Sequence, residues 1–260
     1  MKIVDCFIFY NELDMLEFRL KELNDIVDYF VLVESTYTFM SHPKELYYEK
    51  NKSRFEKYKD KIVHIIVEDM KLDKNPWQNE YFQRNCIDRG IKKLNLDSKD
   101  IIIIADCDEI PDSNTLKLYK NKGVENICIL EMDMYYYNLT CKYDNMKWYF
   151  AKILSYEKYL TINSPEYIRK THYKHNLQKI KKGGWHFSYF GDVNFIKNKI
   201  KEFSHQEFNR LEYLDENKIM KKIENCEDLF SRKSEKWKRV KLEDNEYLPN
   251  NMDLLLKKFK

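Results

Sequence analysis

Three carboxylates follow the most apolar segment of the chain. Residues 101–105 read IIIIA, and Asp106, Asp108 and Glu109 come directly after them. Side chains alternate along an extended chain, so Asp106 and Asp108 point to the same side. Neighbouring carboxylates repel one another, and a hard divalent cation that also binds a diphosphate would neutralise them. The spacing therefore predicts a metal site at Asp106 and Asp108; an acidic turn that caps a helix near Ser113 is the alternative.

The elements that must position these carboxylates follow a β-α-β rhythm. Short, almost entirely apolar segments are typical of strands that are covered on both faces, and here they alternate with amphipathic helical patterns. Open sheets of this kind bind ligands beyond the carboxyl ends of their strands, where the acidic residues lie. We therefore predict an α/β fold with a mostly parallel central sheet. Its expected strands are residues 2–10, 29–34, 62–67 and 101–105.

The second half of the chain has a different pattern. Residues 127–137 and 152–156 are predicted as further strands because they are rich in apolar and aromatic side chains. From residue 192 onwards the sequence is highly charged and its pattern is mainly helical. We expect a catalytic domain over residues 1–210 and a helical C-terminal extension over residues 211–260 that packs on it.

Polar residues end the first two expected strands. Asn11 and Glu12 follow the first strand and Glu34 ends the second, where a nucleotide base and ribose hydroxyls would need hydrogen-bond partners. Arg84, on a helix predicted over residues 77–94, has the bidentate geometry that suits a diphosphate or a carboxylate. Two simpler alternatives remain: Asn11 and Glu12 begin a helix, and Arg84 forms a surface salt bridge.

The charge balance and the apolar pattern exclude several classes of partner. The 46 Lys and Arg residues nearly balance the 43 Asp and Glu residues, so we expect no large basic surface for nucleic acid. An acid at residue 5 interrupts the region where a signal peptide is apolar, and no apolar run reaches the roughly 20 residues of a membrane span. We predict a cytoplasmic protein without a transmembrane segment, with all six cysteines as free thiols.

A set of motifs occurs in order over residues 2–209. The motifs are DCFIFYNELDMLEFRLKELND, VDYFVLVESTYTF, WQNEYFQRN, IIIIADCDEIP, MYYYNL, GGWHFSYFGD and FSHQEFN. Together they resemble glycosyltransferase family 17, which includes enzymes that add a bisecting N-acetylglucosamine to N-glycans in β1,4 linkage. The ordered set is far more specific than a lone Asp-X-Asp pair.

The resemblance implies a GT-A-like nucleotide-sugar-binding fold, an inverting reaction and a UDP-sugar donor, with N-acetylglucosamine as the expected sugar. The acceptor would be a glycan or another hydroxyl compound, and the metal would be Mn²⁺ or, as second choice, Mg²⁺. By position, Asp108 ligates the metal and Asp106 contacts the metal or the ribose. His186, after a turn expected at Gly183 and Gly184, is the third expected ligand, with a buried core histidine as the alternative.

Inversion requires a carboxylate that removes the proton of the acceptor hydroxyl. Glu207, in the segment SHQE, is the first candidate for this base, Asp192 is the second and Glu109 is the third. Glu109 is also suited to orienting donor hydroxyls. Sequence spacing alone does not rank these carboxylates by their distance from the acceptor.

Two other functions stay open beside sugar transfer. One is a non-catalytic carbohydrate- or nucleotide-binding module, and the other is a metal-dependent nucleotide-sugar hydrolase. The Asp-X-Asp pair and His186 argue against the binding module. The sequence offers no obvious activated nucleophile or second metal cluster, which argues against the hydrolase. The sequence names neither the acceptor nor the oligomeric state.

Overall fold

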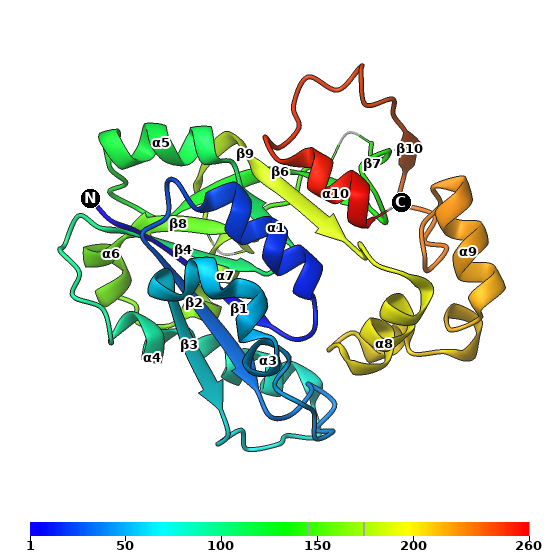
Figure 1. Ribbon diagram of the computed structural model, residues 1–260, viewed down its shortest axis with the longest axis horizontal. Helices are drawn as coiled ribbons and strands as arrows, with labels where there is room; N and C mark the ends of the chain where they lie inside the picture. The colour runs from blue at the N-terminus through cyan, green and yellow to red at the C-terminus, as the bar shows by residue number, and fades with distance from the viewer. Residues whose placement is uncertain (145, 174, 260) are drawn as a thin grey trace.

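Four neighbouring parallel strands form the first half of the sheet in the computed structural model, which describes residues 1–144, 146–173 and 175–259 (Figure 1). Strand β1 pairs with β4 on one side and with β2 on the other, and β3 pairs with β2. The four strands predicted from apolar segments are thereby confirmed. They are β1 (Ile3–Phe9), β2 (Tyr29–Ser35), β3 (Ile62–Val67) and β4 (Ile101–Asp106).

The second half of the sheet is mixed, so the prediction of a mostly parallel sheet is wrong there. Strand β8 pairs antiparallel with β4 and β6, β7 pairs antiparallel with β6 and β10, and β9 runs parallel to β6 but antiparallel to β5. The order is β10-β7-β6-β8-β4-β1-β2-β3. Short connections join β6, β7 and β8, and a short connection returns the chain antiparallel, whereas a parallel neighbour needs a long crossover. The bounds are β5 (Glu109–Pro111), β6 (Cys128–Tyr136), β7 (Cys141–Tyr143), β8 (Lys152–Ser155), β9 (Gln178–Ser188) and β10 (Trp237–Arg239).

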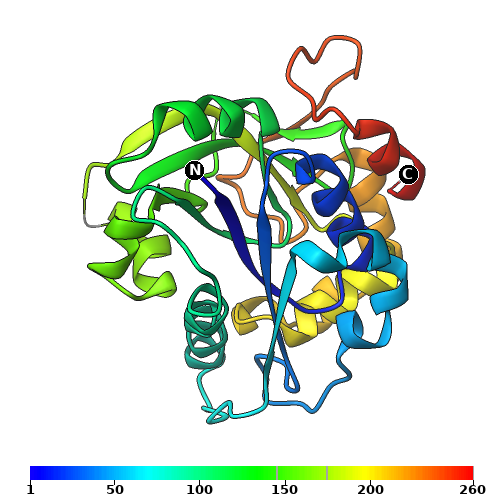
Figure 2. The ribbon, with the colours of Figure 1, turned by 60° about the vertical axis from the view of Figure 1, so that its left-hand side comes forward.

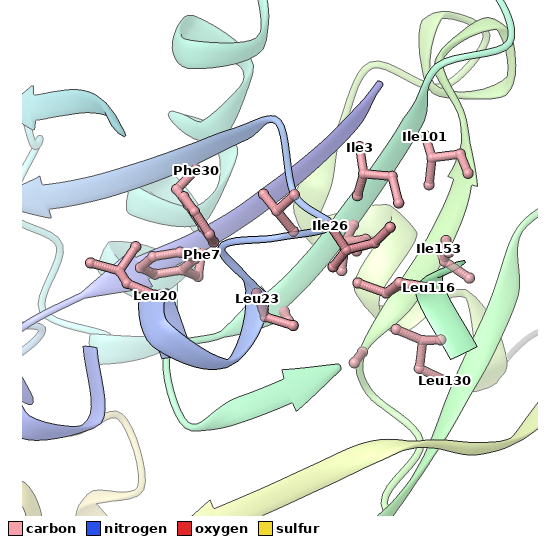
Figure 3. Packing of buried hydrophobic residues seen from close by; sticks show 14 of the residues in the cluster. Ile3, Phe7, Leu20, Leu23, Ile26, Phe30, Ile101, Leu116, Leu130 and Ile153 are labelled. Carbon is pink, nitrogen blue, oxygen red and sulfur yellow. The ribbon is translucent and has the colours of Figure 1, made fainter. Parts of the chain in front are cut away.

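Apolar layers cover both faces of the parallel half, and helices lie on either side of it (Figure 2). Along β1, Ile3 and Phe7 belong to one buried cluster, while Val4 and Cys6 belong to the other. Figure 3 shows the first cluster, where Leu20 packs beside Phe7. This two-sided burial explains why the strands read as continuous apolar runs. The covering helices are α1 (Leu13–Leu23) and α5 (Ser113–Lys122) on the first face, and α4 (Ile87–Ile91), α6 (Tyr156–Leu160) and α7 (Pro165–Lys170) on the second.

The helix predicted over residues 77–94 is two helices in the structure. Helix α3 (Pro76–Asn85) begins at the proline, and the side chain of Asn75 accepts a hydrogen bond from the backbone N–H of Trp77. Cys86 separates α3 from α4. Between β2 and β3 lie the short α2 (Tyr47–Lys50) and the 3₁₀ helix η1 (Lys52–Lys61).

The C-terminal part of the chain is less helical than predicted, because it also contributes β10 to the sheet. A disulfide joins Cys141 in β7 to Cys226 at the end of α9, so the prediction of free thiols is wrong for this pair; their 85-residue separation hid the pairing in the sequence. Cys6, Cys86, Cys107 and Cys128 are free and buried. The remaining elements are η2 (Thr171–Tyr173), α8 (Val193–Glu202), η3 (Gln206–Phe208), η4 (Leu211–Tyr213), α9 (Glu216–Asn225) and α10 (Met252–Lys258).

Two apolar clusters join the extension over residues 211–260 to the body, in addition to the β10–β7 pairing and the disulfide. Leu255 of α10 shares a buried cluster with Trp185 of β9, and Phe230 shares another with Tyr136 of β6. The domain boundary expected at residue 210 stays a prediction. None of the helices in the described ranges combines the length and the apolar character that crossing a membrane requires.

Candidate active site

A cavity of about 740 Å³ opens at the carboxyl ends of β1 and β4. Helices α3 and α7 contribute to its walls, together with β9 and α8. A position beyond the carboxyl ends of parallel strands is where open α/β sheets bind ligands. The chemically important side chains of its lining are Glu12, Arg84, Asp106, Asp108, His186 and Lys199.

Asp106, the last residue of β4, is held by two buried arginines. Arg84 Nη1 binds its Oδ1, and Arg169 Nη2 lies 2.5 Å from its Oδ2. Arg84 also binds Glu80 at 2.5 Å and Glu166 at 2.8 Å. Both carboxylate oxygens of Asp106 therefore already have a guanidinium partner.

Asp108 has a different pair of partners. Lys199 Nζ lies 2.8 Å from Oδ2, and His186 Nε2 lies 3.5 Å from Oδ1, which is longer than a normal hydrogen bond. Burial by itself raises the pKa of the Asp108 carboxyl, but the Lys199 ammonium and the His186 ring outweigh it and hold the pKa well below its usual range. Asp108 is therefore ionised at neutral pH and faces the cavity.

Glu109 lies beneath Asp106 and Asp108 and is fully buried. Two Arg169 nitrogens bind its two oxygens at 2.7 Å each, and Trp148 Nε1 donates to Oε1 at 2.5 Å. Burial raises the pKa of Glu109, but the Arg169 guanidinium lowers it more, to about 2. Glu109 is outside the described lining of the cavity, so this carboxylate anchors the site from below.

Strand β9 brings His186 opposite Glu109. Gly184 has a φ of +145°, and a Cβ there would lie 2.1 Å from the backbone oxygen of Ile110, so only glycine allows β9 to approach β5 this closely. The Gly-Gly pair lies within β9 at an irregularity of its pairing with β6, and the turn predicted there is wrong. The His186 ring packs on Trp148 at 4.3 Å between centroids, and its buried Nδ1 has no hydrogen-bond partner among the described residues.

A buried arginine supports the acidic loop from the other side. Arg19 of α1 forms a bidentate ion pair with Asp5, at 2.6 and 2.7 Å. Its Nη1 also donates to the backbone oxygens of Asp106, Cys107 and Glu109 at 2.8 to 3.1 Å. These bonds satisfy the carbonyl groups where the chain leaves β4, and so help to hold the carboxylates in place.

The residues predicted to bind a nucleotide are only partly brought together. Glu12 lines the cavity, and its Oε2 accepts from the backbone N–H groups of Tyr10 and Asn11, both at 3.1 Å. Asn11 Nδ2 donates to Asn198 of α8 at 3.3 Å. Glu34 is buried outside the described lining, where its carboxylate accepts from the N–H of Tyr48 at 3.0 Å. Arg84 lines the cavity, but it is a buried ion-pairing residue and its surface alternative is wrong.

The carboxylates predicted as the base lie outside the described lining of the cavity. Asp192 caps α8 by accepting from the N–H of Phe195 at 2.7 Å. Glu207 is 53% exposed and pairs with His205 at 2.7 Å. Glu202, at the end of α8, does line the cavity, although the sequence did not single it out.

Besides Glu202, three residues of the site escaped the sequence prediction. Arg169 and Lys199 lie 63 and 91 residues from the aspartates that they bind, and no local pattern marks them. Arg19 had a usable signal: it lies among Leu16, Leu20 and Leu23 on the apolar face of α1, where an unpaired charge would be costly. A buried partner could have been inferred from that position.

The site has two side chains of the type that a divalent cation prefers. The Asp108 carboxylate and the His186 imidazole face one another across 3.5 Å, and hard and borderline divalent metals accept oxygen and nitrogen ligands. Within the described part of the chain, no three His, Cys, Asp or Glu side chains form a group that could hold a metal. An ion held by Asp108 and His186 would thus need further ligands from a bound diphosphate or from water.

Comparison with known proteins agrees with the motifs. The protein is 29% identical over 127 residues to the beta-1,4-mannosyl-glycoprotein 4-beta-N-acetylglucosaminyltransferases of Rattus norvegicus and Homo sapiens, and 28% identical to that of Mus musculus. The matched region is 45% of this chain but only 24% of each relative. The sequence profile described as Glycosyltransferase family 17 matches residues 1–244. Because this match covers nearly the whole chain and includes the acidic motif and His186, the protein belongs to glycosyltransferase family 17.

Proposed function

We propose that this protein is an inverting glycosyltransferase that transfers N-acetylglucosamine from a UDP-sugar to a glycan or another hydroxyl acceptor. The observation that carries the proposal is the position of Asp108, which pairs with Lys199 and faces a cavity at the carboxyl ends of parallel strands in a member of glycosyltransferase family 17. The parallel half of the sheet is consistent with a GT-A-type nucleotide-binding unit. The N-acetylglucosaminyltransferase relatives support the choice of sugar.

The donor would bind with its diphosphate beside Asp108 and its nucleoside toward Tyr10 and Glu12, which line the same cavity. We propose Mn²⁺, with Mg²⁺ as second choice, held by Asp108 and His186. Such an ion, when bound, supplies positive charge to the departing diphosphate. A contact of Asp106 with the metal or the ribose would require one of its arginine ion pairs to open.

For the general base we propose Glu202 instead of Glu207. A carboxylate bound by a cation is a poor proton acceptor, and most carboxylates of the lining are bound in this way. Asp106, Glu80 and Glu166 pair with Arg84, and Asp108 pairs with Lys199. Glu202 instead contacts His42 Nδ1 at 3.0 Å.

Glu202 follows Lys199 by one turn of α8, so both side chains lie on one helix face and both reach the cavity. In the proposed reaction, the acceptor hydroxyl gives its proton to Glu202 while its oxygen attacks the anomeric carbon. The bond from that carbon to the diphosphate breaks on the opposite face, and UDP departs. This displacement inverts the configuration.

A product assay tests the proposal against its two alternatives. The purified protein is incubated with UDP-N-acetylglucosamine, Mn²⁺ and a panel of glycans, and products are identified by mass spectrometry, with their anomeric configuration determined by NMR. A glycan enlarged by one N-acetylglucosamine, with inverted linkage, supports the proposal. Release of free sugar as the main product would identify a hydrolase, and donor binding without turnover would identify a binding module.

We retain the cytoplasm as the proposed location, although a disulfide such as Cys141–Cys226 is more typical of oxidising compartments.

A further inference from the structure

Most of the positive charge around the cavity is already committed to carboxylates. Arg84 binds Glu80, Asp106 and Glu166, so its donors are directed at three anions. Arg169 binds Asp106 and both oxygens of Glu109. The charge of each guanidinium group is therefore already neutralised by two or three carboxylates.

Lys199 differs from both arginines. Its ammonium carries three N–H donors, and its one hydrogen bond to a described side chain is the 2.8 Å bond to Asp108 Oδ2. It lines the cavity, and its aliphatic stem is largely enclosed, since the side chain is only 22% exposed. Its remaining donors are therefore the best placed to meet an anion that approaches Asp108.

The fold of α8 holds Lys199 in this position. Ile196 and Ile200 are buried on the inner side of the helix, and Asp192 caps its first turn. The Lys199 Nζ lies 5.4 Å from the centroid of the Tyr189 ring, a distance at which a cation and a ring attract one another. The helix, the ring and Asp108 together orient the ammonium.

We infer that Lys199 is a phosphate-binding residue that holds the diphosphate of a nucleoside-diphosphate donor while it remains paired with Asp108. This inference rests on the proposed function and adds a side chain that recognises phosphate without any metal ion. Asp108 would then repel the diphosphate less than an unpaired carboxylate would, because the positive charge of the Lys199 ammonium offsets its negative charge. A neutral nucleoside has no phosphate for Lys199 to bind, so its affinity for the protein does not depend on Lys199.

The test compares UDP with uridine by titration calorimetry in the presence of a chelator. Lys199→Met is expected to weaken UDP binding about tenfold or more and to leave uridine binding unchanged, since a charge-assisted hydrogen bond is lost. Lys199→Arg should retain most of the affinity for UDP. Lys197→Met is the matched control, because Lys197 lies on the same helix and pairs with Glu216, outside the described lining.

A second pair of variants covers the case in which Lys199→Met misfolds because Asp108 is left buried without its partner. Asp108→Asn removes that charge, and in chelator it should bind UDP more tightly than the wild type does. Adding Lys199→Met to Asp108→Asn should abolish this gain. Melting temperatures of all variants are measured alongside.

Three results separate the possible conclusions. Selective loss of UDP binding in both Lys199→Met backgrounds supports the inference. Equal losses for UDP and uridine, or no loss for either, would overturn it and leave the proposed glycosyltransferase activity standing. A wild-type protein that binds UDP neither in chelator nor with Mn²⁺ would overturn both.

Discussion

Arg169 binds both oxygens of Glu109, with Nη1 2.7 Å from Oε2 and Nη2 2.7 Å from Oε1, and both residues are buried. The same guanidinium group reaches Asp106, so one arginine joins the buried anchor to the half-buried end of β4. The site is thus built in two levels. Glu109 forms the lower level, and Asp106, Asp108 and Arg169 line the cavity above it.

The Glu109–Arg169 ion pair predicts that the protein loses part of its free energy of unfolding in acid. The pKa of Glu109 falls from 4.5 to about 2 on folding, so its stabilising contribution is present above pH 4.5 and is lost as the pH falls toward 2. Glu109→Gln should therefore lower the free energy of unfolding at pH 7, by about 3 kcal/mol, as breaking a buried ion pair does. The difference from wild type should shrink as the pH is lowered from 5 to 3, as measured by urea denaturation at each pH. Glu45→Gln, which breaks an exposed pair with Lys50, is the control, and a difference independent of pH would contradict the assignment.

Donor binding is expected to depend on a divalent ion. Without one, the diphosphate of UDP-N-acetylglucosamine meets the ionised Asp108 with only partial neutralisation, so calorimetry should show weak binding in chelator and stronger binding with Mn²⁺. Asp108→Asn should lose the effect of Mn²⁺ and at least about a hundredfold of transfer activity, and its melting temperature is measured alongside because Lys199 loses its carboxylate partner. Asp244→Asn, at an exposed position, should behave like wild type. Equal donor affinity with and without Mn²⁺ in the wild type would argue against the ion.

The two glutamates near the end of α8 make a matched pair for the base. Glu202→Gln should abolish sugar transfer and retain UDP binding, because a general base acts on the acceptor and the amide cannot accept its proton. Glu207→Gln should retain most activity, since Glu207 is 53% exposed and lies outside the described lining. Steady-state transfer rates and UDP affinities of both variants show which of the two glutamates acts as the base. Loss of transfer in Glu207→Gln alone would return the role to Glu207.

The Cys141–Cys226 disulfide should stabilise the attachment of α9 to β7. It closes a loop with a sequence separation of 85 residues, and a crosslink of that span contributes about 4 kcal/mol in the chain-entropy view. Replacing both cysteines with serine should lower the melting temperature by several degrees, whereas Cys128→Ala serves as a variant without a crosslink effect. Mass spectrometry after alkylation in denaturant without reductant should find these two cysteines unlabelled and the four free cysteines labelled. Labelling of Cys141 and Cys226 under these conditions would rule the crosslink out.

Several features of the site depend on the order of residues alone. The four parallel strands, the acidic residues that follow β4 and the motifs of glycosyltransferase family 17 are local patterns that can be identified without knowledge of tertiary contacts. Short, continuous apolar runs are typical of strands covered on both faces, and neighbouring parallel strands end at the same edge of the sheet. The position of Asp106 and Asp108 at that edge follows from these two facts.

The tertiary structure decided which charges neutralise the acidic motif and which carboxylates face the cavity. Arg169 and Lys199 reach Asp106 and Asp108 across 63 and 91 residues, and Glu202 reaches the cavity only because α8 folds over it. The mixed half of the sheet and the Cys141–Cys226 disulfide also depend on contacts between distant parts of the chain. Such contacts depend on how distant elements pack, and ion pairing carries no periodicity that a sequence pattern could reveal. The sequence therefore determined where the carboxylates are, and the packing determined their partners.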